Sequence, residues 1–290
     1  MGTGVELRSI ARERLAKLSI LLSAENKPST LCTAESIGYL EGDQFYKFGL
    51  VSRIPDGFSP HKPPVTLHNL LSRKPLLGTS SKAPLPSLSQ RFTMASSLAT
   101  SLYTFMLARW HHKMFNSLNI YFLFSEGDSG LPNLNTPLVG GYSVSRPSAV
   151  EEFSMCAARS PLSECYLHPQ LRVAARERPR YTTSYEIYSL GLLLAEIGFW
   201  QPISKIVAAT TPRHGGHSAE GLKKAVVEKV STDLACWMGE QYRDITLRCL
   251  KAGDGLRLGG GIGDELSEFY WSVVMELVLF EERVKVLRSP

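Results

Sequence analysis

Residues 185–199, which read YEIYSLGLLLAEIGF, form a nearly continuous apolar run that constrains the fold more than any other part of the chain. A helix that is apolar on all sides has to be buried on all sides. The most apolar part, residues 190–200, has about half the length needed to cross a bilayer and contains Glu196. We therefore expect a central helix inside a large helical domain, and no membrane segment.

The remaining patterns predict a small mixed region followed by a mainly helical one. Apolar residues recur at three- and four-residue spacing over 5–22 and 88–106, which predicts two amphipathic helices. Residues 31–40 and 45–54 carry β-branched and aromatic side chains around a turn signal, which predicts a hairpin. Further helices are expected at residues 219–240, 241–250 and 265–287. The predicted fold class is therefore α+β.

A shift in composition predicts how the chain is divided. Residues 55–86 are rich in Pro, Ser, Lys and Gly, and only 65–71 resemble a helix. This stretch is interpreted as a linker with an exposed insertion. The predicted organisation is a front region at 1–56, the linker and insertion at 57–87, and a helical region at 88–290.

Composition argues against several classes of function. The net charge of +5 comes from 32 basic and 27 acidic residues spread along the chain, without a basic block that would bind nucleic acid. The five cysteines are odd in number and form no C-x-x-C pair, so neither a disulfide framework nor a zinc site is indicated. The amino terminus lacks a secretory pattern. We expect a cytoplasmic protein that binds neither nucleic acid nor metal.

Residues 112–119, which read HKMFNSLN, resemble the catalytic loop H-R-D-x-x-x-x-N of protein kinases. His112, Lys113 and Asn119 stand where the family has His, Arg and Asn. Met114 stands at the Asp that accepts the proton of the substrate hydroxyl. A thioether cannot accept this proton at neutral pH, and general-base help is worth about 10²- to 10⁴-fold in rate. The resemblance implies a kinase-like loop without its catalytic base, followed by a strand at 120–123.

A second motif also lacks its carboxylate. Gly141, Tyr142 and Ser143 resemble the kinase D-F-G motif, whose Asp binds magnesium. Gly141 stands in place of that Asp. The resemblance therefore implies that the metal site is lost together with the catalytic base.

Residues 166–170, which read YLHPQ, resemble the end of a kinase activation segment. In kinases a Pro there is followed by a Glu that pairs with a distant Arg. Tyr166, His168 and Pro169 belong to this resemblance, Gln170 replaces the Glu, and Arg257 is similar to the distant Arg. The resemblance implies a hydrogen bond between Gln170 and Arg257, with one charge fewer, where kinases have an ion pair.

The beginning of the buried apolar run supplies the most specific match. Glu186, Tyr188, Ser189 and Gly191 resemble the kinase motif D-x-W-S-x-G. The acidic group of that motif braces the catalytic loop, and the resemblance gives this role to Glu186. The front region matches less well. If residues 5–22 are the helix that presents a Glu to the ATP lysine, the three earlier strands, the Gly-rich loop and the lysine are missing.

The whole pattern, over about residues 5–285, is similar to the degenerate kinase-like domains of filamentous fungi that are associated with HeLo-type prion-inhibition and propagation domains. The elements WHHK at 110–113 and YLHP at 166–169 resemble two that recur in that family. The resemblance implies a two-lobed kinase-like fold with a truncated N-lobe. It also implies a pseudokinase without a cofactor, which binds other proteins in signalling or heterokaryon incompatibility.

Two alternatives stay open. Asn119 and a carboxylate such as Asp128 could hold magnesium and leave a residual ATP-binding Ser/Thr-type kinase. The chain could also be a truncated gene product without function. Binding of ATP with magnesium distinguishes the first alternative, and failure to form a folded protein distinguishes the second.

Overall fold

The computed structural model describes residues 4–42, 48–72, 85–127, 130–147, 161–174, 177–208, 218–254 and 262–286, which form a mixed α+β structure. The helices are α1 (Gly4–Ser23), α2 (Leu67–Leu71), α3 (Leu88–Leu107), α4 (Pro161–Glu164), α5 (Thr183–Phe199), α6 (Ile203–Ala208), α7 (Ala219–Met238), α8 (Glu240–Lys251), α9 (Ile262–Phe269), the π-helix η5 (Tyr270–Val274) and α10 (Met275–Val286). The strands and 3₁₀ turns are η1 (Ser29–Leu31), β1 (Ser36–Glu41), β2 (Phe48–Ser52), β3 (Val65–Thr66), β4 (Trp110–His111), β5 (Ile120–Phe122), β6 (Leu138–Val139), η2 (Tyr142–Val144), β7 (Arg146–Pro147) and η3 (Pro169–Leu171). The predicted α+β class is confirmed.

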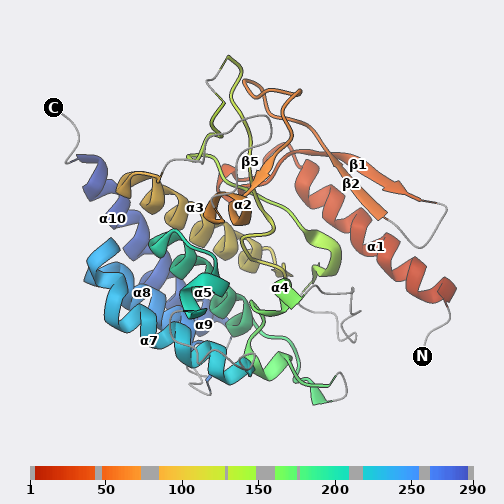
Figure 1. Ribbon diagram of the computed structural model, residues 1–290. Coiled ribbons are helices and arrows are strands. Elements are labelled where there is room, and N and C mark those ends of the chain that lie inside the picture. Colours follow the sequence, from red (N-terminus) through yellow and green to blue (C-terminus); the bar gives the residue numbers. More distant parts are fainter. Residues whose placement is uncertain are drawn as a thin grey trace.

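Helix α1 and the β1–β2 hairpin lie together at one side of the molecule, and α5 and α7 to α10 gather at the other (Figure 1). The two strands pair antiparallel. Glu41 at the end of β1 accepts hydrogen bonds from Arg8 at 2.5 Å and from Arg12, which fix α1 against the hairpin. The predicted helix and hairpin are confirmed, with strands shorter than expected. Among the described residues, no helix combines the length and hydropathy that a bilayer span requires.

Part of the segment 57–87, which was predicted as a linker with an exposed insertion, contributes to the core. Val65 and Thr66 form β3, which pairs antiparallel with β5, and three of the five residues of α2 are buried leucines. The Thr66 side chain caps α2 by accepting a hydrogen bond from the Asn69 backbone N–H. The Pro and Ser content that suggested a linker is local, whereas burial of α2 depends on contact with β5. Residues 73–84 lie outside the described part.

Helices α3 and α5 form the centre of the helical part. Helix α3 begins with a capping box formed by Ser87 and Gln90, which satisfies two backbone N–H groups of the first turn. Apart from its first two residues, α5 is buried along its whole length, as predicted. A Cβ atom at Gly191 would lie only 2.8 Å from the backbone nitrogen of Leu250. Gly191 therefore permits the close approach of α8 to α5.

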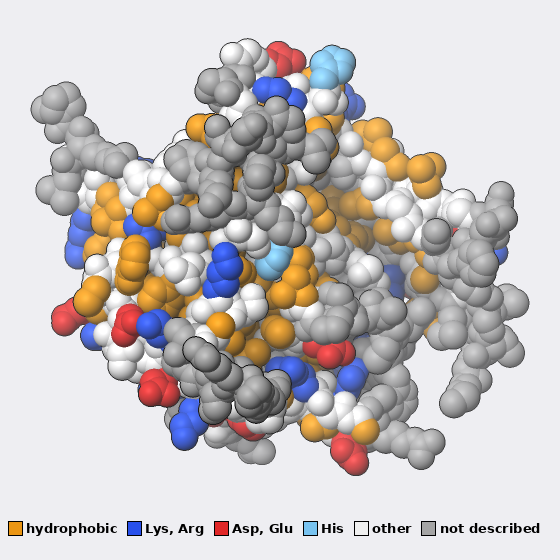
Figure 2. Space-filling view, in the orientation of Figure 1, with side chains coloured by type: hydrophobic (Ala, Val, Ile, Leu, Met, Phe, Trp, Pro, Cys, Tyr) orange, Lys and Arg blue, Asp and Glu red, His pale blue; other side chains and the backbone are white. Residues whose placement is uncertain are grey.

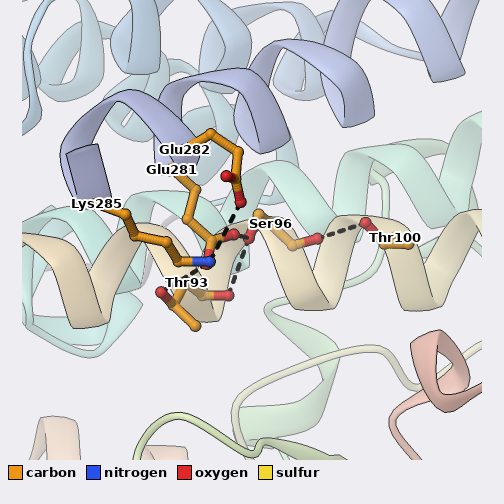
Figure 3. A network of polar contacts seen from close by, with 6 residues as sticks. All are labelled: Thr93, Ser96, Thr100, Glu281, Glu282 and Lys285. Carbon is orange, nitrogen blue, oxygen red and sulfur yellow. Dashed lines mark hydrogen bonds and ion pairs between the residues drawn. The ribbon is translucent and has the colours of Figure 1, made fainter.

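The last predicted helix, at 265–287, is divided into α9, the π-helix and α10. Helix α10 packs along α3, and a polar cluster joins the two (Figure 3). Glu281 accepts hydrogen bonds from Thr93 at 2.8 Å and from Ser96, and its ion pair with Lys285 spans 2.7 Å. Burial raises the pKa of Glu281, but these hydrogen bonds outweigh it and hold the pKa below its usual range. The cluster therefore favours an ionised carboxylate between two helices.

Two small sheets hold the ends of the loop at residues 112–119. Strand β4, just before the loop, pairs antiparallel with β7, and β5, just after it, lies between β3 and β6. The strand predicted at 120–123 is confirmed as β5. This pairing brings the loop beside Gly140 and Gly141, which follow β6 directly.

Candidate functional site

His112 anchors the loop from a fully buried position. Its Nδ1 accepts a hydrogen bond from the Met114 backbone N–H at 3.2 Å, so the proton of a neutral ring is assigned to Nε2, which donates to the Gly140 carbonyl at 2.9 Å. Burial lowers the pKa of His112 to about 4, against a smaller opposite effect of the hydrogen bond to Gly140. His112 is therefore neutral at physiological pH and ties the loop to the end of β6.

Asn119 closes the other end of the loop. Its Nδ2 donates to the Met114 carbonyl at 2.9 Å and lies 3.3 Å from the Asn116 side-chain oxygen. The Asn119 amide is thus engaged across the loop by the Met114 carbonyl. Met114 is half-buried.

Gly141 lies directly against Asn119. Its φ of +79° is in the left-handed region, and a Cβ there would come within 2.7 Å of Asn119 Cβ and closer still to Cγ and Oδ1. Asn119 therefore fills the space that a side chain at position 141 would need. Within the described ranges, no three His, Cys, Asp or Glu side chains converge in a way that would hold a metal ion. Asp128, the possible substitute ligand, lies outside them.

Tyr142 and Ser143 continue the same turn. The Tyr142 hydroxyl donates to the Val139 carbonyl at 2.6 Å, and its ring centroid lies 5.1 Å from that of His112. Phe105 of α3 packs against both rings. Ser143 is exposed. The turn is thereby anchored to the loop and to α3 through aromatic contacts.

Glu186 of α5 contacts the loop at residues 112–119. Its carboxylate accepts a hydrogen bond from the Lys113 backbone N–H at 2.7 Å, and Lys113 has a φ of +64°. The Lys113 ammonium lies 4.8 Å from the Tyr181 ring centroid. Burial raises the pKa of Glu186 to about 7, and the Lys113 N–H opposes this increase. The hydrogen bond to Glu186 therefore stabilises Lys113 in a left-handed backbone conformation that non-glycine residues rarely adopt.

Tyr166 joins the loop to α5 through a carboxylate whose role the sequence analysis missed. The Tyr166 hydroxyl donates to Glu196 at 2.6 Å and lies 2.7 Å from the Ser117 hydroxyl. The Ile203 backbone N–H donates to the same Glu196 oxygen at 2.8 Å, and Ser189 donates to the Tyr166 carbonyl at 3.1 Å. Burial raises the pKa of Glu196 to about 7. The available signal was a single acid inside an otherwise apolar helix.

His168 belongs to a second cluster, which includes residues that the sequence did not indicate. Its Nε2 lies 3.2 Å from the Lys223 ammonium, which forms an ion pair with Asp254. The His168 ring packs edge-on against Tyr188 at 4.9 Å. Burial, and then Lys223, lower the pKa of His168 to about 4. Pro169 is buried in η3, directly after His168. This cluster ties the segment after α4 to α5 and α7.

Gln170 and Arg257 were predicted to be partners. The Gln170 side-chain oxygen accepts a hydrogen bond from the Tyr185 hydroxyl at 2.8 Å. Arg257 lies outside the described residues, so the predicted pair stays a prediction. Tyr185 thus provides a tie between η3 and α5 that the motif did not indicate.

A cavity of about 980 Å³ opens between α1, the hairpin and the turn at Gly140 to Ser143. Its walls are mainly apolar side chains of α1, β2, β5 and β6. The charged side chains among the described residues that line it are Arg8, Arg14 and Arg53. Figure 2 shows hydrophobic side chains around a recess on this side of the molecule. The turn at Gly140 to Ser143 therefore borders a large, mainly apolar pocket, which the loop at residues 112–119 does not line.

Residues 49–279 match a protein family described as a domain of unknown function (DUF7580). The match covers most of the chain. The chain belongs to the DUF7580 family. The DUF7580 match includes the loop, the Gly141 turn and the clusters around Tyr166 and His168. It begins within β2. No curated protein matches this chain.

Proposed function

We propose that this chain has a two-lobed protein-kinase-like fold, has lost phosphoryl transfer and acts as a protein-binding or signalling module. In this proposal α1 and the hairpin are a reduced N-lobe, and the helical part from α3 onward is the C-lobe. The pocket between them corresponds to the cleft in which kinases bind nucleotide.

Contacts within three motifs support the kinase-like part of the proposal. Glu186 binds the backbone of the loop at Lys113, which is the bracing role that the resemblance implies for it. The rings of His112 and Tyr142, at the positions of the kinase loop His and the D-F-G Phe, pack against one another at an angle of 60°. Gly191 allows the close approach of α8. These contacts maintain the shape of the loop without requiring a reaction.

The packing of Asn119 against Gly141 is the observation that best supports a loss of catalytic activity. In kinases these two positions supply an Asn and an Asp that bind magnesium. Here a side chain at 141 would overlap Asn119, and the Asn119 amide is bound to the Met114 carbonyl. Met114 itself has no group that accepts a proton at neutral pH. The loop is thus arranged for its own stability and not for catalysis.

The assignment to signalling rests on the resemblance of WHHK and YLHP to the fungal kinase-like domains. Fold alone does not specify function. In this proposal the partners are other proteins, with a role in non-self recognition or heterokaryon incompatibility in the cytoplasm, and no cofactor is needed.

A thermal-shift titration with ATP, with and without magnesium, tests the proposal. A ligand at 100 times its Kd stabilises a protein by about 2.7 kcal/mol, which corresponds to a Tm increase of roughly 5–10 °C for a domain of this size. We expect no magnesium-dependent increase at millimolar ATP and no phosphate transfer to a generic substrate, with an active kinase as the control. A magnesium-dependent Tm increase together with phosphate transfer would instead establish the residual kinase.

A further inference from the structure

The cavity beside α1 has the size and lining of a site for an apolar ligand. Its volume of about 980 Å³ lies near the upper end of the roughly 300–1,000 Å³ typical of small-molecule pockets. Leu15, Leu18 and Leu22 of α1 face it at helical spacing, and Leu50 of β2 and Leu138 of β6 line it as well. Such walls favour an alkyl chain over a polar ligand.

The charged groups of the cavity give it a preference for anions. Arg8 and Arg53 form ion pairs with Glu41 and Glu35 at 2.5 and 3.1 Å, and neither glutamate lines the cavity. Arg14 is half-buried, and its pKa is lowered first by burial and then by the charge of nearby Arg146. An anionic group beside Arg14 would offset both the desolvation and the repulsion.

We infer that this cavity binds a single-chain anionic amphiphile, such as a long-chain fatty acid. The alkyl chain lies among the leucines, and the carboxylate lies beside Arg14. Binding is reversible and involves no reaction. This inference goes beyond the proposed function and does not depend on it, because it uses only the walls and charges of the cavity.

Isothermal titration of the full chain with monomeric decanoate, dodecanoate and tetradecanoate is the first test. We expect one site per chain and a Kd that decreases by about fourfold for each added methylene group. Dodecylamine and dodecanol should bind at least tenfold more weakly than dodecanoate. Absence of saturable binding, or dodecylamine binding as tightly as dodecanoate, would overturn the inference.

Three variants locate the site. Arg14→Gln should weaken dodecanoate by about tenfold and leave dodecanol unchanged, because it removes only a charge-assisted contact. Lys17→Gln, on the same helix but outside the cavity lining, should leave both unchanged, because among the described residues Lys17 pairs only with Glu13 of the same helix. Ala11→Phe, which places a ring in the cavity, should weaken both ligands, whereas Ala16→Phe on the same helix and outside the lining should not.

Two results at this stage would argue against the cavity. One is dodecanoate binding to an Ala11→Phe protein of unchanged Tm as tightly as to the original chain. The other is binding to vesicles of anionic phospholipid that dodecanoate does not displace, which would indicate association with a membrane surface instead. Because the chain-length series uses the unmodified protein, the inference stays testable if a variant fails to fold.

Discussion

Replacing Gly141 with alanine tests the packing on which the proposed loss of activity depends. Two costs are expected at this position. The φ of +79° would hold the new alanine in the left-handed region, which costs about 1–2 kcal/mol. The new methyl group also overlaps the Asn119 side chain, and overpacking of this kind costs typically about 1–3 kcal/mol. Together they predict a loss of about 2–5 kcal/mol in the free energy of unfolding.

Gly57→Ala is the matched control for backbone strain. Gly57 has a φ of +81°, and a Cβ there meets nothing within 4 Å. Its replacement should therefore cost only the strain, about 1–2 kcal/mol. Urea denaturation of both variants separates the two effects, because the difference between them measures the overlap with Asn119. If Gly141→Ala costs no more than Gly57→Ala, the reasoning about Asn119 is wrong.

A double-mutant cycle with Asn119→Ala identifies the overlapping residue. Asn119→Ala removes Cγ and Oδ1 but leaves a Cβ 2.7 Å from the new methyl group, so the relief is partial. The single change should cost about 1 kcal/mol, since it removes the hydrogen bond to Met114. In the cycle we expect a favourable coupling of about 1–2 kcal/mol. Additive effects would show that the two residues do not overlap.

Three further predictions concern α5 and its contacts. Tyr166→Phe removes a hydrogen bond to buried Glu196 and should cost about 1.5–3 kcal/mol in urea denaturation, whereas Tyr188→Phe should be close to neutral, because its hydroxyl has no hydrogen-bond partner among the described residues. Because burial raises the pKa of Glu196 from 4.5 to about 7, the unfolded chain releases this proton first and stability should decrease as pH rises from about 4.5 to about 7. Glu196→Gln should remove this component of the pH dependence. If the variant keeps the same slope of unfolding free energy against pH, the raised pKa of Glu196 is contradicted. Gly191→Ala should lower the unfolding free energy by about 1–3 kcal/mol, since its Cβ would press on the Leu250 backbone nitrogen. An unchanged midpoint of urea denaturation would show that α8 shifts to accommodate the methyl group without cost.

The helices and the hairpin could be predicted because their signals are local. The apolar spacing in α1 and α3 and the continuous apolar run in α5 each depend on residues that are close in sequence. The same local reasoning indicated a helix at 65–71, where α2 lies, but did not predict that this helix is buried. A short helix between Pro- and Ser-rich stretches resembles a linker until its leucines meet β5, and nothing in the neighbouring residues reports that contact.

The candidate site was only partly accessible in the same way. The motif residues His112, Asn119 and Gly141 were identified by resemblance, but the overlap between Asn119 and Gly141 was not. Lys223 and Asp254 were missed, since they meet His168 from distant parts of the chain. A lone Lys or Asp on a helix or loop carries no signal of such a partner.

By itself, then, the sequence determined the mixed class, the buried helix and the lack of an acid at Met114 and Gly141, because hydrophobic period and residue chemistry belong to single segments. The tertiary structure alone decided that Asn119 fills the space beside Gly141, that α2 belongs to the core, and that three arginines border one apolar cavity. These features are distances between side chains on separate segments, and only the packing of those segments sets such distances.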